Sequence, residues 1–233
     1  MNEKTGNIAI AQLNKRQVLL FSEKKILLRT IGHKGSGADL IDKAWSAVAF
    51  TSSGNIIVVQ TSPQDRNKLS VFTERGHHVT DISKHLLNPW CVSVRNDGKL
   101  LVCDGREVKV LSPDGANLMQ TVKAPFCDED PFFAIHHQGM FFVSYNTLHF
   151  VKVFSDEGQL LYEIGGKGTG DGQLRCPEGL AIDKLNNLVV CDKENSRLQF
   201  FSLEGKFLYS LTKRISAPRS VAVARNGDLL CCD

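Results

Sequence analysis

Short apolar segments alternate with clusters of turn residues along the whole chain. The clearest example runs from Leu174 to Tyr209, where apolar segments at 179–182, 187–191, 197–201 and 206–209 are separated by Asp, Asn, Ser and Gly. These residues accept the dihedral angles of tight turns, and segments of this length without a helical period form antiparallel strands. The pattern predicts a four-stranded meander. One such sheet cannot bury both of its faces, so we expect a repeating array.

The turn that precedes the second strand of this unit recurs through the chain. It contains Gly6, Gly54, Gly98, Gly139, Asn187 and Gly227, which follow one another at intervals of 40 to 48 residues. Glycines after the third strand recur at a similar interval, at Gly76, Gly115, Gly158 and Gly205. This period is typical of propeller blades. We therefore predict an all-β propeller with units at about 1–40, 41–84, 85–127, 128–174, 175–213 and 214–233.

The unit at 177–201 resembles the NHL repeat. The matching residues are Pro177, Gly179, Asp183, Asn187, Asp192, Asn195, Arg197, Gln199 and Phe201. The resemblance implies a six-bladed propeller of four-stranded antiparallel sheets. Counting strands gives twenty-one, with only three in the first unit and two in the last. We therefore expect five to six blades and a chain that is incomplete at both ends of the ring, with open strand edges there.

The composition is that of an ordinary folded protein. Hydrophobic residues make up 42% of the chain and charged residues 23%, which excludes a disordered chain. The formal net charge of +3 is too small to indicate a DNA-binding protein. No apolar run approaches the roughly 18 residues of a spanning helix, and no signal-peptide pattern follows Met1. We expect a cytoplasmic protein with no DNA or membrane partner.

The seven cysteines do not form a metal or disulfide pattern. No C-x-x-C spacing occurs, and Cys231 and Cys232 are adjacent, which suits neither zinc nor an ordinary disulfide. Cys103, Cys191 and Cys232 occupy the end of the second strand in three different units, so they cannot pair with one another. We interpret these three as small buried apolar residues.

Two polar groups that could suggest chemistry have structural interpretations. Asp192, Asn195 and Arg197 lie in a turn, where Asp accepts backbone N–H bonds, Asn takes a left-handed conformation and Arg pairs with the Asp. The glycine-rich run at 165–172 lacks the G-K-[ST] end of a phosphate loop and no helix follows it. We expect it to be a linker between blades.

No catalytic or cofactor-binding signature emerges from the remaining residues. His77-His78 and His136-His137 are adjacent pairs, whose side chains on a strand point to opposite sides. We assign both pairs to surface or turn positions, and His136-His137 to the turn after a first strand. There is no G-x-S-x-G, and no pair of carboxylates has a spacing that requires shared geometry. We predict no catalytic residue, metal or cofactor in this chain.

One face of the predicted propeller collects the least regular loops. Alternating strands bring the loops after the second and fourth strands of each unit to the same face. The predicted partner-binding residues on this face are Trp45, Trp90, Arg106, Phe132, Lys193 and Arg219. Aromatic and basic side chains together bind single-stranded RNA or anchor a protein partner. The alternative is that Trp45, Trp90 and Phe132 fill the propeller interior.

The resemblance implies an interaction platform. In tripartite-motif (TRIM-NHL) ubiquitin ligases, upstream RING and B-box regions carry the ubiquitin chemistry and the propeller recruits protein or RNA. We expect this chain to be such a recruiting domain, acting in protein turnover or post-transcriptional regulation. Two alternatives remain: a propeller enzyme of the peptide-amidating-lyase type, and a purely structural protein-binding adaptor. The lyase is disfavoured because the positions just before the first strands do not offer a ring of histidines or carboxylates. They hold Trp45, Trp90, Phe132, Glu178 and Arg219.

Overall fold

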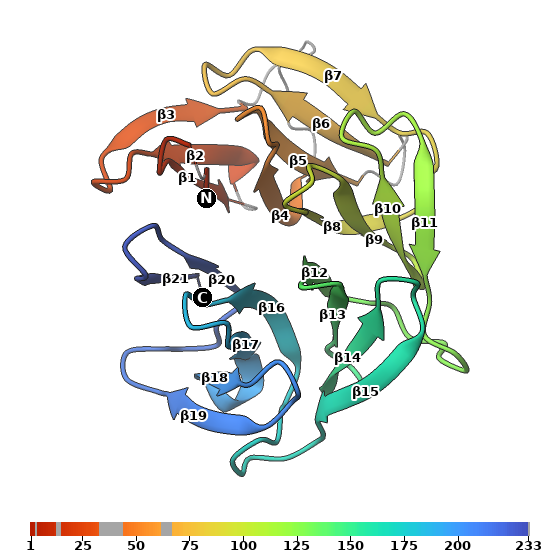
Figure 1. The fold of residues 1–233 in the computed structure, drawn as a ribbon. Helices are drawn as coiled ribbons and strands as arrows, with labels where there is room; N and C mark the ends of the chain where they lie inside the picture. The colour runs from red at the N-terminus through yellow and green to blue at the C-terminus, as the bar shows by residue number, and fades with distance from the viewer. Residues whose placement is uncertain (3, 13–14, 33–43, 62–66, 233) are drawn as a thin grey trace. The chain divides into compact units, whose positions relative to one another are not determined.

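Antiparallel β-strands make up nearly all the regular structure of the chain (Figure 1). The computed structural model describes residues 1–2, 4–12, 15–32, 44–61 and 67–232, and the side chains of residues 44–46 lie outside this description. Twenty-one strands occur in the described part. The chain divides into two compact units, at Met1–Thr121 and Val122–Asp233. The predicted all-β architecture is confirmed.

The first unit contains one three-stranded and two four-stranded sheets, each with its strands in chain order. The three-stranded sheet consists of β1 (Ile8–Gln12), β2 (Gln17–Phe21) and β3 (Leu27–Ile31). The second consists of β4 (Ala44–Phe50), β5 (Ile56–Gln60), β6 (Lys68–Phe72) and β7 (His78–Ile82). The third consists of β8 (Pro89–Val94), β9 (Leu100–Asp104), β10 (Glu107–Leu111) and β11 (Leu118–Val122), the last residue of which begins the second unit.

The second unit contains two four-stranded sheets and one two-stranded sheet. The first consists of β12 (Phe133–His137), β13 (Met140–Tyr145), β14 (Phe150–Ser155) and β15 (Leu160–Gly165). The second consists of β16 (Pro177–Ile182), β17 (Leu188–Asp192), β18 (Arg197–Phe201) and β19 (Phe207–Leu211), with the 3₁₀ turn η2 (Lys193–Asn195) between β17 and β18. The last consists of β20 (Ser220–Val223) and β21 (Leu229–Cys232).

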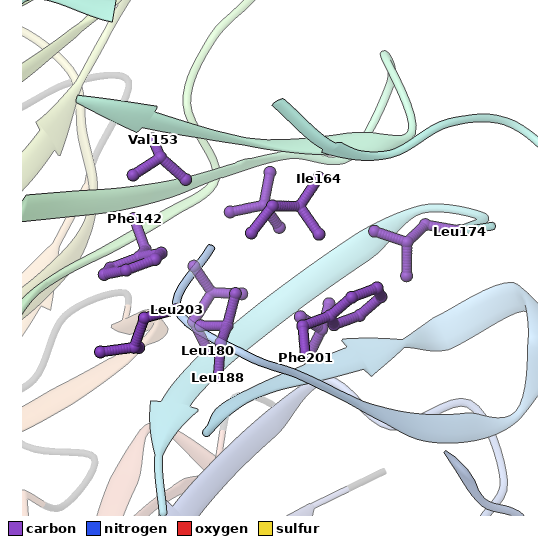
Figure 2. Packing of buried hydrophobic residues seen from close by; sticks show 10 residues of the cluster. Phe142, Val153, Ile164, Leu174, Leu180, Leu188, Phe201 and Leu203 are labelled. Atoms are coloured by element: carbon purple, nitrogen blue, oxygen red, sulfur yellow. The ribbon is translucent and has the colours of Figure 1, made fainter. Parts of the chain in front are cut away.

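Face-to-face packing of neighbouring sheets builds the core of the second unit (Figure 2). Phe142 and Val153 extend from one sheet, and Leu180, Leu188 and Phe201 from the next. Every residue of β17 and β18 is buried, because both faces of these middle strands are covered. The outer strand β19 is exposed at most positions. Burial therefore decreases from the middle strands to the outer strand, as in a blade packed between two others.

The turns after the first strands repeat one hydrogen-bonding pattern. Thr51 N, Arg95 N, Asp183 N and Ala224 N donate to the carbonyls of Asn55, Lys99, Asn187 and Asp228 at 2.7–2.9 Å. A residue with positive φ, Gly54, Gly98, Asn186 or Gly227, closes each turn. The sequence period thus corresponds to a repeated turn geometry.

Two local predictions were wrong. Cys103 and Cys191 are buried as expected, but Cys232 is exposed, because it lies in a sheet of only two strands. His136 and His137 are the last residues of β12 and do not lie in the turn. His136 Nε2 contacts Asp156 at 2.8 Å, and His137 Nε2 contacts Asn186 at 3.1 Å. The two rings thus point to different partners, as neighbouring strand residues must.

Candidate functional site

β-bulges lie near the start of β4, β8 and β16. The pairing register shifts between Ala44 and Val48, between Pro89 and Cys91, and between Pro177 and Leu180. Bulges redirect side chains and are frequent beside functional sites. The predicted site residues Trp45 and Trp90 occupy two of these bulges, and Glu178 occupies the third. The sequence had placed all three before their strands, because it could not show that pairing begins at the preceding residue.

A buried aspartate at the end of the second strand anchors the loop that enters the bulged strand. Asp192 Oδ1 accepts Arg175 N at 2.7 Å. In the equivalent sheet of the first unit, both carboxylate oxygens of Asp104 lie 3.0 Å from Leu87 N, and Asp104 also accepts Asn88 N. The side chain of one strand thus fixes the backbone that leads into its neighbour.

Asp192 also organises the turn after β17. Arg197 Nε donates to Asp192 Oδ2 at 2.7 Å, and the Asn195 amide donates to the same oxygen at 2.9 Å. The structural interpretation of this group is confirmed, with one correction. The left-handed residue is Ser196, at φ 50°, whereas Asn195 ends the 3₁₀ turn η2, which keeps its amide directed at Asp192.

The glycine-rich run is a linker, as predicted, and Arg197 holds it in place. Arg197 Nη2 donates to Gly170 O at 2.7 Å and to Gln173 O at 2.9 Å. Gly172 N donates to Gln199 Oε1 at 3.0 Å. These bonds consume the polar groups of the turn, so the turn and the run form a scaffold for the residues beside them.

Glu178, Lys193 and Arg219 form the central cluster of the candidate site. The Glu178 side chain is 2% exposed and accepts Lys193 Nζ on Oε1 at 2.5 Å. Its Oε2 has no hydrogen-bond partner among the described residues, and Arg219 Nη1 lies 4.0 Å away. Two predicted site residues are therefore brought together by a buried acid. Glu178 was expected just before a first strand and was not among the predicted partner-binding residues.

Backbone bonds fix the position of this cluster. Gly179 N donates to Arg219 O at 2.9 Å, and Arg219 N donates to Cys232 O at 2.8 Å. Ser144 Oγ donates to Glu178 O at 2.7 Å. Adjacent strands on both sides thus hold Glu178, while the Arg219 side chain, 57% exposed, extends into solvent. The arrangement presents one exposed cation, Arg219, beside the partly buried Lys193 on a rigid base.

A second polar group borders the cluster. Arg175 Nη2 pairs with Glu194 Oε2 at 3.2 Å, and the Cys176 amide donates to His149 Nδ1 at 3.1 Å. Burial and the hydrogen bond to Glu194 raise the pKa of the Cys176 thiol to about 11. The thiol is therefore protonated near neutral pH and does not act as a thiolate nucleophile.

The other predicted site residues lie at comparable places in their sheets. Phe132 directly precedes β12, is partly buried and donates its backbone N–H to Ser144 O at 2.8 Å. Trp90 is partly buried in β8, and Arg106 is exposed in the turn between β9 and β10. Trp45 lies in β4, with its side chain outside the described residues. Trp45, Trp90 and Arg106 belong to the first unit and Phe132, Lys193 and Arg219 to the second.

Sequence reasoning missed two exposed apolar side chains in the connecting loops. Leu87 precedes β8 and is 80% exposed, and Phe126 lies fully exposed in the loop before β12. An apolar residue inside a polar loop was the available signal for both.

In the part of the chain that the structure describes, no three His, Cys, Asp or Glu side chains are close enough to hold a metal ion.

Comparison with known proteins identifies the repeat. Residues 174–201 match the family model of the NHL repeat. The chain carries an NHL repeat. This stretch covers the glycine-rich linker's end, β16, β17 and β18, and thus contains Glu178, Lys193 and the Asp192 turn. The chain thus resembles NHL-repeat propellers.

Curated relatives extend the likeness over most of the chain. This chain is 25% identical to human E3 ubiquitin-protein ligase TRIM32 across 98% of its length, and 26% identical to the mouse protein across 84%. It spans only 39% and 32% of those two proteins. It is also 33% identical to the Drosophila melanogaster protein brain tumor, over 29% of the chain.

Solved structures show the same fold at low sequence identity. A Bacteroides caccae protein of unknown function matches with a TM-score of 0.71 at 14% identity, covering 97% of this chain and 82% of its own. A catalytically inactive virginiamycin B lyase from Staphylococcus aureus, solved with quinupristin, gives a TM-score of 0.70 at 13% identity, covering 99% and 75%. These matches establish the fold alone.

Among the described residues, no helix has the length and apolar character needed to cross a membrane.

Proposed function

We propose that this chain is an interaction platform, the recruiting propeller of a TRIM-like ubiquitin ligase. The observation that carries the proposal is the cluster of Lys193 and Arg219 around the buried Glu178. Glu178 balances one of the two cations, so the cluster keeps a net positive charge. The exposed Arg219 guanidinium presents planar donors that match carboxylate and phosphate groups.

The cluster is suited to hold an anionic ligand. The Arg219 backbone is bonded on both sides, so its side chain needs little reorganisation of the main chain to meet an anion. Phe132 offers a partly exposed aromatic ring in the same unit. An acidic protein segment or the backbone of single-stranded RNA supplies the anion in our proposal. Ubiquitin transfer itself would require a zinc-bearing module outside these residues.

We also place the protein in the cytoplasm. The thiols of Cys91, Cys103 and Cys191 are buried and do not form disulfides. Unpaired buried thiols suit a reducing compartment. The proposal includes a role for this chain in protein turnover or post-transcriptional regulation, which the likeness to TRIM32 supports.

The test separates RNA from protein partners. Binding of a pool of short single-stranded RNAs is measured against salt concentration for the natural chain and for Trp45→Ala, Arg106→Ala and Arg219→Ala, with Lys206→Ala as the matched control in an exposed turn. An RNA site predicts affinity that falls steeply with salt, and a salt slope reduced by about one in each arginine variant. The control is expected to match the natural chain.

A polyglutamate peptide serves as the probe for an acidic protein partner. Peptide binding that is lost in Arg219→Ala and in Lys193→Ala, without RNA binding at low salt, assigns protein recruitment to this cluster. Absence of both kinds of binding overturns the cluster as a recruiting site. One tightly held metal ion per purified chain would instead favour the lyase-type alternative.

A further inference from the structure

The outer strand of the first sheet carries a run of exposed apolar residues. Ile26, Leu27 and Leu28 are 61%, 51% and 51% exposed. Consecutive strand residues point to opposite faces, so neither face of this half of β3 is covered. The following half docks normally, since Ile31 is only 2% exposed. The turn and the start of β3 therefore project from the sheet with an apolar tip.

A bulge contributes to this exposure. Arg29 pairs with Leu20 and Leu27 with Phe21, so Leu28 is the extra residue. The same bulge occurs between β18 and β19, where Leu208 is the extra residue and is 39% exposed. Leu208 and Tyr209 form a run of only two exposed apolar residues, because Phe207 before them is partly buried and packs on the core. Leu118 and Met119 of β11 form another such pair. The run of three at 26–28 is the longest among the described residues.

Basic side chains surround the apolar tip. Lys24 and Lys25 precede it, Arg29 follows it, and all three are exposed. The Arg29 stem lies against the Gly76 turn, which brings exposed Arg75 to the same region. We call Lys24, Lys25, residues 26–28, Arg29 and Arg75 the basic-apolar patch.

The neighbouring acids are directed away from this patch. Glu74 accepts the side-chain amides of Asn2 at 2.8 Å and Asn7 at 3.2 Å. The Glu23 side chain folds against Gly6. Both carboxylates thus face the N-terminal turn, and the lysines and arginines keep an unbalanced positive charge. Contiguous apolar and basic residues on an exposed element mark an interaction surface.

We propose that the basic-apolar patch docks onto an anionic phospholipid surface. A peptide strand added to β3 would cover its edge and leave the faces exposed, whereas a bilayer interface surrounds a projecting tip on all sides. Apolar side chains in the headgroup region favour binding by burial, and Lys or Arg near anionic lipids favours it by electrostatic attraction. This proposal departs from the sequence-based prediction of no membrane partner, which rested on the absence of a spanning apolar run.

Vesicle sedimentation tests this surface. The full chain is mixed with phosphatidylcholine vesicles that contain about one phosphatidylserine in three lipids, and with phosphatidylcholine alone. We expect binding to the anionic vesicles only. Leu28→Glu and the pair Lys24→Glu with Lys25→Glu are each expected to reduce it about tenfold or more, whereas Leu208→Glu, the equivalent bulge residue in β19, is expected to leave it unchanged.

Three results would overturn the proposal. The first is no binding to the anionic vesicles at low salt. The second is an equal loss of vesicle binding in Leu28→Glu and Leu208→Glu. The third is unchanged vesicle binding by Leu28→Glu, together with competition by polyglutamate. The last result would assign the patch to an acidic protein instead. Circular dichroism melts of each variant separate loss of the surface from loss of the fold.

Discussion

At the scale of single residues, buried acids determine the geometry of the candidate site. Asp192 has no exposed surface and accepts bonds from a backbone amide and from the side chains of Arg197, Asn195 and Gln199. Glu178 is almost as buried, but one of its oxygens makes no hydrogen bond within the described residues. Asp192, whose carboxylate is fully hydrogen-bonded, has a structural role. Glu178, whose carboxylate is only partly bonded, lies beside Lys193 and the exposed Arg219, which would meet an anionic ligand.

Removal of Asp192 is expected to be severe. Asp192→Ala leaves Arg197 buried without its carboxylate, which costs about 3 to 5 kcal/mol of unfolding free energy. Asp228→Ala, in an exposed turn, is the matched control and is expected to change stability by less than about 0.5 kcal/mol. Urea unfolding followed by circular dichroism measures both. Similar values for the two variants would contradict the assigned role of Asp192.

At the scale of strands, the sequence period predicted each antiparallel sheet because Gly, Asn and Asp punctuate the chain where turns need positive φ. It could not predict the bulges at Trp90 and Glu178, since pairing that begins at a proline depends on the neighbouring strand. The packing of Glu178 with Lys193 and Arg219 was hidden for the same reason. Two of these three residues were identified only as members of a loop face.

Close approach of β16 and β20 predicts a sensitive glycine. A Cβ on Gly179 would lie 2.8 Å from both Arg219 O and the Ser220 Cα, which are backbone atoms. Gly179→Ala is therefore expected to lower the unfolding free energy by about 1 to 3 kcal/mol and to weaken ligand binding at Arg219. Gly170→Ala is the control, because its new Cβ would meet only the flexible Gln173 side chain. Equal melting temperatures for the two variants would refute this account.

The pairing of β6 with the outer strand β7 predicts an acid-sensitive contact. Burial opposes ionisation of Asp81, but hydrogen bonds from Lys68, Ser70 and His78 prevail and lower its pKa to about 2. Because the folded pKa lies below the unfolded value, this stabilisation is present above about pH 4 and is lost as the pH falls towards about 2.

Asp81→Asn is expected to remove that part of the acid dependence. The effect on unfolding free energy is less than about 1 kcal/mol, since a third of the side chain is exposed and solvent screens the pairs. Denaturant midpoints measured between about pH 2 and 5 test it. A variant with the natural chain's full loss of stability over that range would exclude Asp81 as its source.

At the scale of the whole molecule, the cluster of Glu178, Lys193 and Arg219 and the basic-apolar patch belong to different compact units and share no residue. Leu28 lies in the first unit and Arg219 in the second. Mutations at sites without shared partners are usually additive. We therefore expect Leu28→Glu to leave RNA or polyglutamate binding unchanged and Arg219→Ala to leave vesicle binding unchanged. If the double variant binds vesicles, RNA or polyglutamate more weakly than the corresponding single variant does, the two surfaces are coupled.

The buried aspartates Asp192 and Asp104, with their basic partners Arg197 and Lys109, also set a rule for exchanging loops between repeats. In β18, Arg197 spans Asp192 and two carbonyls of a long glycine-rich connection. In β10, Lys109 Nζ meets Asp104 at 2.6 Å and one carbonyl, His85 O, of a short connection at 2.7 Å. The basic residue and the loop whose carbonyls it bonds therefore act as one unit. A loop moved from one repeat to another needs its own lysine or arginine. If the loop is moved alone, a buried donor or carbonyl is left without a hydrogen-bond partner.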